Sequence, residues 1–512
     1  MKANRILRLA LIVGALSGGM IQTASAQQSL WTTYRDAGQV QFQAGNYVEA
    51  ERLIRLALNA AQSFNPEGRR VASTMSDLAR AYEAQGKYAE AEPIHIRALE
   101  IMQNARGPYD GETAAVLNNL AVFYSRFGKE DQVVELLKRS LASMEAQYGP
   151  FNSDTASILG NLAATFTELG RYEEAEPMHR RCLAITESIY GKQHPDVATR
   201  LSNFACLLTL QGKFDQAEPM FNEALSIRST WLGREHVETV EIDNNLGYLY
   251  FLMGKDEQAE QLLRHAVAVL EKSLGPDHAY VGLSLKNLGL VYQDTGKYDL
   301  AAQYYQRSIS ILEKSLGPDH LNVARVLQYW AQLNVQQGKY EVAEPMLLRA
   351  VAILEKTKGP NALPTTIPLK ALAELKRAQG NSDAAKPYFK RVAGILEQLV
   401  AANPKDRAAL NDLAWMQATC PDDDFRDASK AFDNANKAYQ LDGGQSSVYL
   451  KTLAAAYAEN RAFPQARSWV TKAIDHTTSD RSKKILGDQL KLYEQPQPYR
   501  DTGSILQVQR TL

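Results

Sequence analysis

Residues 254–295 have the sequence GKDEQAEQLLRHAVAVLEKSLGPDHAYVGLSLKNLGLVYQDT, and residues 296–337 follow with GKYDLAAQYYQRSISILEKSLGPDHLNVARVLQYWAQLNVQQ. Both segments have 42 residues and begin with glycine. The same glycine recurs at this period along most of the chain: Gly86, Gly128, Gly170, Gly212, Gly254, Gly296, Gly338 and Gly380. A second column has the same period: Gly107, Gly149, Gly191, Gly233, Gly275, Gly317 and Gly359. Two turns per unit predict two helices per unit, which is typical of a helical solenoid.

The residues between the glycines support helices. In one unit the apolar residues recur at spacings of three and four, as in Leu117, Leu120, Ala121 and Tyr124. A small residue also follows the central leucine, or its equivalent, in each unit: Ala79, Ala121, Ala163, Ala205, Gly247, Gly289 and Ala331. Small residues at a fixed place predict that two antiparallel helices approach each other closely there.

This pattern resembles the tetratricopeptide repeat, whose usual unit is about 34 residues. The longer unit, with segments such as GKYAEAEPIHIRALEI and LEKSLGPDHLNVA, resembles the kinesin-light-chain subfamily of that repeat over about residues 31–400. The resemblance implies an all-α fold, a right-handed superhelical solenoid of antiparallel helix pairs that binds peptides. It does not imply a motor, because the N-terminus described next would take the chain away from a cytoplasmic kinesin.

The N-terminus has the features of a secretory signal peptide. Basic residues precede an apolar stretch from about Leu9 to Ile21, and Ala24-Ser25-Ala26 offers a cleavage site before Gln27. A membrane anchor is the alternative, but the stretch is shorter than the ~20 apolar residues of a membrane span. We therefore expect a periplasmic or secreted mature protein without a membrane span.

The period divides the remainder of the chain. We expect a signal peptide in residues 1–26 and about nine repeat units in residues 27–402. Asn403-Pro404 breaks the period, and residues 405–476 are expected to form irregular C-terminal repeats. Residues 477–512 are expected to form a capping helix and a tail that is loose after Pro496.

Composition limits the function. The formal net charge is −1, which disfavours nucleic-acid binding because no global basic field is present. The three cysteines, Cys182, Cys206 and Cys420, are too few for a disulfide framework. Cys182 and Cys206 fall on neighbouring predicted helices, and the sequence leaves a disulfide between them open.

No sequence motif points to catalysis. The chain lacks the phosphate-binding GxxxxGK loop and the HExxH and GxSxG motifs. Four histidines also stand 42 residues apart: His194, His236, His278 and His320. Equivalent positions on successive helices lie too far apart for ~2 Å metal bonds, so we interpret these histidines as loop residues that orient the next helix. We predict no enzyme, no metal and no cofactor.

One column of polar residues points to a binding surface. The position before the central leucine reads Asp77, Asn119, Asn161, Asn203, Asn245, Asn287, Tyr329 and Ala371. Asparagine is a poor residue for a helix interior, and its amide both donates and accepts hydrogen bonds. In tetratricopeptide repeats this position faces the concave groove, so the resemblance implies that the five asparagines hold the backbone of an extended peptide. The alternative is that each asparagine binds a neighbouring helix and shapes the repeat.

Apolar residues on the predicted groove side, Tyr248, Phe251 and Leu283, would select the side chains of the peptide. Charges near the column, such as Glu168, Lys286 and Arg325, have mixed signs, so the charge of the partner stays open. The sequence thus favours an exported, noncatalytic scaffold that binds a protein or peptide segment. The alternatives are a structural spacer or self-assembling (homo-oligomeric) component of an envelope complex, and an enzyme with an unfamiliar site.

Overall fold

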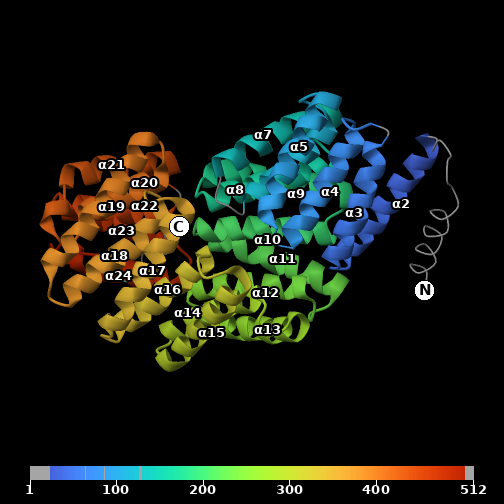
Figure 1. The fold of residues 1–512 in the computed structure, drawn as a ribbon. Helices are drawn as coiled ribbons and strands as arrows, with labels where there is room; N and C mark the ends of the chain where they lie inside the picture. Colours follow the sequence, from blue (N-terminus) through green and yellow to red (C-terminus); the bar gives the residue numbers. More distant parts are fainter. Residues whose placement is uncertain (1–23, 64, 86, 126–129, 445, 502–512) are drawn as a thin grey trace. The chain divides into compact units, whose positions relative to one another are not determined.

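The computed structural model describes residues 24–63, 65–85, 87–125, 130–444 and 446–501. These residues form 23 α-helices and two short 3-10 turns, with no strand among them (Figure 1). The all-α solenoid of paired helices predicted from the glycine period is confirmed. Most of the predicted signal peptide, together with Gly86 and Gly128, lies outside the described residues. Among the described helices, none is both long and apolar enough to cross a lipid bilayer.

The chain divides into two compact units, residues 1–162 and 163–512, and the boundary falls within α8 (Ser153–Glu168). In the first unit each helix packs against the next as a pair: α2 (Ala24–Gln43) with α3 (Tyr47–Gln62), α4 (Arg69–Ala84) with α5 (Tyr88–Arg106), and α6 (Gly111–Ser125) with α7 (Glu130–Tyr148).

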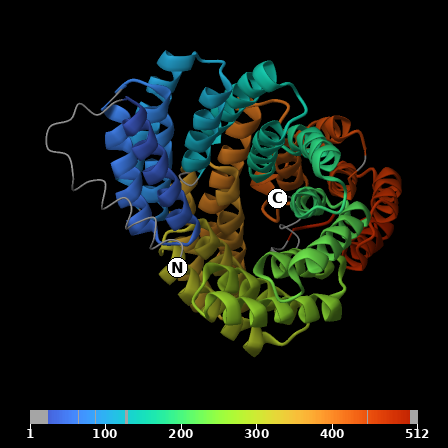
Figure 2. The same ribbon diagram turned by 90° about the vertical axis from the view of Figure 1, so that its right-hand side faces the viewer.

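The second unit continues the same pairing. Helix α9 (Tyr172–Tyr190) packs against α10. The five pairs that follow are α10 (Pro195–Leu210) with α11 (Phe214–Leu232), α12 (Val237–Met253) with α13 (Asp256–Leu274), α14 (Ala279–Asp294) with α15 (Tyr298–Leu316), α16 (Leu321–Gln336) with α17 (Tyr340–Lys358), and α18 (Thr366–Ala378) with α19 (Ser382–Ala402). In Figure 2 the green to orange part of this unit follows a curved path.

The C-terminal helices of the second unit are shorter. They are α20 (Arg407–Thr419) with α21 (Ala428–Asp442), α22 (Ser447–Glu459) with α23 (Phe463–Asp475), and the single helix α24 (Asp480–Glu494). A Tyr439–Trp469–Tyr457 aromatic cluster joins the two pairs. Helix α24 packs on α23 and buries Leu486 and Tyr493.

Glycine ends the helices as the period predicted. Gly254 stands at the C-cap of α12 with φ of +85°, and its N–H donates to the Phe251 carbonyl. Gly275 follows α13 with φ of +88°. A side chain is strained at such positive φ values, so glycine is the residue that ends both helices of the repeat without that cost.

The small-residue column lets the two helices of a pair touch. A Cβ added at Gly289 of α14 would lie 2.7 Å from Cδ1 of Tyr305 on α15, and one added at Gly247 would lie 2.8 Å from Cγ of Leu263. Tyr305 is completely buried, and its hydroxyl donates to Gln293 Oε1 at 2.8 Å. The large residue of the second helix thus fills the space that the small residue of the first helix leaves.

The histidine column caps helices. The Nδ1 atoms of His194, His236, His278 and His320 each accept a hydrogen bond from the backbone N–H two residues ahead, at 3.1 to 3.3 Å. Each histidine is the N-cap of the first helix of its repeat, where backbone N–H groups lack partners within the helix. The interpretation that these residues orient the next helix is confirmed.

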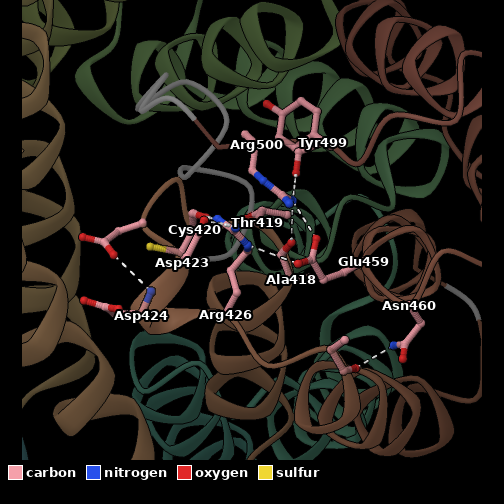
Figure 3. Close-up of polar contacts among 12 residues, drawn as sticks. Ala418, Thr419, Cys420, Asp423, Asp424, Arg426, Glu459, Asn460, Tyr499 and Arg500 are labelled. Atoms are coloured by element: carbon pink, nitrogen blue, oxygen red, sulfur yellow. Dashed lines mark hydrogen bonds and ion pairs between the residues drawn. The ribbon is translucent and has the colours of Figure 1, made fainter.

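The C-terminal tail was expected to be loose after Pro496, and residues 502–512 of it lie outside the described residues. In the described part, Arg500 donates to Glu459 Oε2 at 2.7 Å and Asp501 accepts from Trp415 Nε1 at 2.7 Å, which contradicts the expectation for these residues. Figure 3 shows Arg500 and Arg426 both directed at Glu459. Glu459 is largely buried and carries two arginine partners, which anchors this tail segment on α20 and α22.

Candidate functional site: a groove over the first helices

The first helices of the second unit, α10, α12, α14 and α16, form its inner face. Each of these helices contacts the first helix of the next pair as well as its own partner helix. Side chains that point away from the partner helix therefore face a groove. Asn203 lies on α10, Asn245 and Tyr248 lie on α12, and Asn287 lies on α14, whereas Asn119 on α6 and Asn161 on α8 belong to the first unit.

A cavity of about 400 Å³ opens in this groove. Four of the eight predicted binding residues line it: Asn245, Tyr248, Leu283 and Asn287. A cavity of this size falls in the range that holds small ligands or a few peptide side chains. Half of the binding residues predicted from the sequence therefore lie on one concave surface, formed by α12 and α14.

Two of the predicted asparagines bind a neighbouring repeat. Asn161 Nδ2 donates to Asn118 Oδ1 at 2.9 Å within the first unit, and Asn287 Nδ2 donates to Asn244 Oδ1 at 3.1 Å within the second. In both cases the acceptor stands one position before the column in the preceding repeat. This is the helix-to-helix contact that the sequence left open as an alternative, and it shapes the repeat at these two positions.

The side-chain oxygen of Asn287 is a buried acceptor without a hydrogen-bond donor among the described residues. Asn287 is 4% exposed, and its Oδ1 atom has no hydrogen-bond partner among the described residues. A buried acceptor without a donor costs free energy. Because Asn287 lines the cavity, a donor from a bound molecule would remove that cost.

The remaining asparagines differ in exposure. Asn203 on α10 is exposed, Asn119 on α6 is half-buried, and Asn245 is half-buried in the cavity wall. Asn245 Oδ1 receives only a long hydrogen bond of 3.4 Å from Asn244. The column therefore contains two amides held by a neighbouring repeat and one further amide, that of Asn245, in the cavity wall.

The three apolar residues are also placed differently. Leu283 is half-buried and lines the cavity, and the Tyr248 ring stacks against Phe251 with 6.2 Å between ring centroids. Phe251 is only 1% exposed, and the guanidinium of Arg481 lies 4.2 Å from its ring centroid. Phe251 is thus covered by the C-terminal part of the chain, which the sequence did not predict.

The charges around this cavity have one sign. Lys286 and Arg325 line it, and no carboxylate does so among the described residues. Burial, assisted by the nearby Arg325, lowers the pKa of Lys286 to about 7. The Lys286 Nζ atom lies 5.6 Å from the centroid of the Tyr248 ring. Charges of both signs were expected along the whole column, but the two charged residues that line this cavity are both cations.

The cavity is bounded on its other side by the C-terminal helices. Ser447 and Val448 of α22, Thr477 before α24 and Ser482 within α24 complete its wall. A further contact joins the same regions, because Arg407 of α20 forms an ion pair with Glu173 of α9. Within the second unit, the C-terminal repeats therefore close over the groove of the middle repeats.

The described residues contain no group of three or more His, Cys, Asp or Glu side chains that could hold a metal ion. None of the three cysteines forms a disulfide within the described residues, and burial raises the pKa of Cys206 and of Cys420 to about 12. A thiol with so high a pKa is protonated at neutral pH and is a poor nucleophile.

Paired helices stacked into a grooved solenoid define a helical-repeat protein. The family model described as tetratricopeptide repeat matches residues 29–94, 70–146, 154–230, 238–314, 281–356 and 322–398, which together exceed half of the chain. The chain belongs to the tetratricopeptide repeat family. Members of such repeat families commonly act as protein-interaction scaffolds and are typically noncatalytic.

Comparison with solved structures found chains of low sequence identity. BtubC (BKLC) from P. vanneervenii is 21% identical, over 46% of this chain and 92% of that chain, with a TM-score of 0.35. A putative kinesin light chain with nearly identical TPR-like repeats from Podospora anserina is 22% identical, over 40% of this chain and 98% of that chain, with a TM-score of 0.33. A search of curated proteins found no significant match.

Proposed function

We propose that this chain is an exported, noncatalytic scaffold that binds a segment of another protein in the groove over α10, α12, α14 and α16. The observation that carries the proposal is the cavity on α12 and α14, where four predicted residues meet and where the buried Asn287 Oδ1 lacks a donor. The N–H groups of a peptide backbone are donors of the required kind, and they are present whatever the side chains of the peptide.

Export is proposed from the sequence alone. The basic residues, the apolar stretch and the small residues at 24–26 are typical of a secretory signal peptide. The helix α2 begins at Ala24, so cleavage before Gln27 would shorten it by three residues. The kinesin-light-chain-like unit of 42 residues supports a peptide-binding groove, and it does not imply a motor.

The groove-binding proposal is tested with two pairs of asparagine substitutions. The variant Asn203→Ala/Asn245→Ala removes one amide that is exposed on α10 and one that lines the cavity. The matched variant Asn161→Ala/Asn287→Ala removes the two amides that bind a neighbouring repeat. Each variant and the parent are immobilised and exposed to envelope extract, and captured proteins are identified and their affinities measured.

We expect the first pair to weaken capture by about tenfold while leaving the melting temperature unchanged, since its amides make only weak contacts within the fold. The second pair is expected to lower the melting temperature, because it breaks contacts between repeats, and to weaken capture as well, because it removes the Asn287 amide that lines the cavity. Equal capture by the parent and the first pair would contradict binding through the asparagine column. Absence of any captured partner, with dimers in light scattering, would instead favour self-assembly.

A further inference from the structure

Arg481 makes several polar contacts between the C-terminal part of the second unit and the middle repeats. One terminal nitrogen donates to the Phe251 carbonyl at 2.6 Å, and the other donates to Asp256 at 2.8 Å and to Asp294 at 2.5 Å. The guanidinium also lies over the Phe251 ring, and the side chain is 11% exposed. Two carboxylates, a carbonyl and an aromatic face therefore surround a single arginine.

The repeats would hold a cation at this point even without Arg481. The Phe251 and Leu252 carbonyls belong to the last turn of α12, where the helix dipole is negative and carbonyl oxygens can accept further hydrogen bonds. Burial raises the pKa of Asp256, and the neighbouring Asp294 raises it further while Arg481 opposes both. Two carboxylates this close repel each other unless a cation lies between them.

The geometry favours a guanidinium over an ammonium. A planar guanidinium can donate in fixed directions to three acceptors while its face stacks on an aromatic ring. An ammonium is a compact, strongly hydrated charge without a flat face. The three acceptors and the ring come from α12, α13 and α14, so the site is built by consecutive repeats and not by the C-terminal helices.

The residues next to Arg481 close the groove. Ser479 is completely buried, and its hydroxyl donates to the Leu252 carbonyl at 2.7 Å. The Arg481 backbone nitrogen passes 3.3 Å from the place of a Cβ on Gly254, so the glycine turn leaves the space for this approach. Thr477 and Ser482 form part of the wall of the neighbouring cavity. Residues 477–482 therefore occupy the surface that an extended partner segment would use.

We propose that α12, α13 and α14 form a guanidinium-binding site, that residues 477–482 hold it in the closed state, and that an arginine-bearing segment of a partner protein binds by replacing them. This proposal rests on the groove-binding function above and names the chemistry of the partner. Replacement requires competition with a tethered segment, whose effective concentration is in the millimolar range for short connections. Removal of the tethered arginine should therefore strengthen binding of a free one.

The test uses the full chain and a fluorescent peptide with the sequence of residues 476–486, HTTSDRSKKIL. The variant Ser479→Ala/Arg481→Ala opens the site, and the matched control Lys483→Ala/Lys484→Ala removes two exposed cations from the same helix. Fluorescence anisotropy should show that the peptide binds the open variant at least about tenfold more tightly than it binds the parent or the control. Exchange of the peptide arginine for lysine should weaken binding to the open variant by about tenfold.

Equal binding of the arginine and lysine peptides, or no binding to the open variant, would overturn the proposal. If the open variant loses helix content, Asp256→Asn/Asp294→Asn in the otherwise unchanged chain is examined by hydrogen exchange. Exchange at residues 477–482 should then rise at least about tenfold, and unchanged exchange would overturn the proposal. Failure to capture a protein with the parent chain would count against the proposed function, whereas peptide binding to the open variant reports on the guanidinium site alone.

Discussion

Replacement of Gly289 by alanine tests how the two helices of a repeat pack. The new Cβ would lie 2.7 Å from Cδ1 of Tyr305, which is closer than carbon atoms pack in proteins. Tyr305 is completely buried, so its ring cannot move into solvent. Overpacking of this kind costs about 1 to 3 kcal/mol, and a shift of the ring would also weaken its hydrogen bond to Gln293, worth about 1 kcal/mol.

Alanine also favours the helix. It exceeds glycine in helix propensity by about 1 kcal/mol, which offsets part of the packing cost. We therefore expect Gly289→Ala to lower the free energy of unfolding by about 1 to 3 kcal/mol, measured from urea transitions followed by helical circular dichroism.

Gly394 provides the matched control for this experiment. It stands within α19, and a Cβ added there meets nothing within 4 Å. Gly394→Ala should therefore raise the free energy of unfolding by about 0.5 to 1 kcal/mol through helix propensity alone. The two variants make the same chemical change with opposite expected signs. If both stabilise the protein, the proposed contact between Gly289 and Tyr305 does not constrain the repeat.

Three further predictions concern titration, capping and the tail. Burial raises the pKa of Glu374 to about 7 from the usual 4.5, so the native state binds more protons between these values and stability falls as the pH rises through them. Glu374→Gln should flatten that fall in urea midpoints taken across this range, and an unchanged slope would contradict the assignment. His278→Ala should lower stability by about 0.5 to 1 kcal/mol through loss of the N-cap, whereas His278→Asn should not, as thermal unfolding of the two variants will show. Arg500→Ala should lower the free energy of unfolding by about 1 kcal/mol, because it removes the hydrogen bond to Glu459. The control is Lys491→Ala, which removes only an exposed ion pair, and equal urea midpoints for the two variants would mean that the tail is not anchored.

The glycine period predicted the helices of the repeat because each glycine ends the helix that directly precedes it. Gly254 and Gly275 end α12 and α13 through local backbone geometry, and His278 caps α14 through a bond to the next turn. Such contacts span only a few residues, so the order of residue types along the chain determines them. The pairing of helices follows from the same short connections.

Contacts across the solenoid could not be predicted in this way. Arg481 and Asp256 are 225 positions apart, and the small rotations between successive repeats together determine whether they meet. Phe251 lies on α12, but it is buried, and its cover by Arg481 depends on a segment beyond the last regular repeat. The tail at Asp501 has no periodic pattern either, and it is held by Trp415 from another helix.

Only part of the candidate site could be predicted from the sequence, for the same reason. The asparagine column could be aligned from the period, yet its sequence gives no sign that Asn287 binds Asn244 while Asn203 stays exposed. These differences depend on how neighbouring repeats tilt and on which residue precedes the column. The gathering of Lys286 and Arg325 at one cavity likewise depends on the curvature of the stack.

Site-specific photo-crosslinking tests the central claim, groove binding, most directly. A photoreactive residue is placed at Leu283, which lines the cavity, and in a separate variant at Val342, which is 45% exposed on the second helix α17. After irradiation in envelope extract, the account predicts a crosslinked product of defined mass from position 283 and none from position 342. Crosslinking at position 342 but not at position 283 would place partner binding outside the groove and contradict the account.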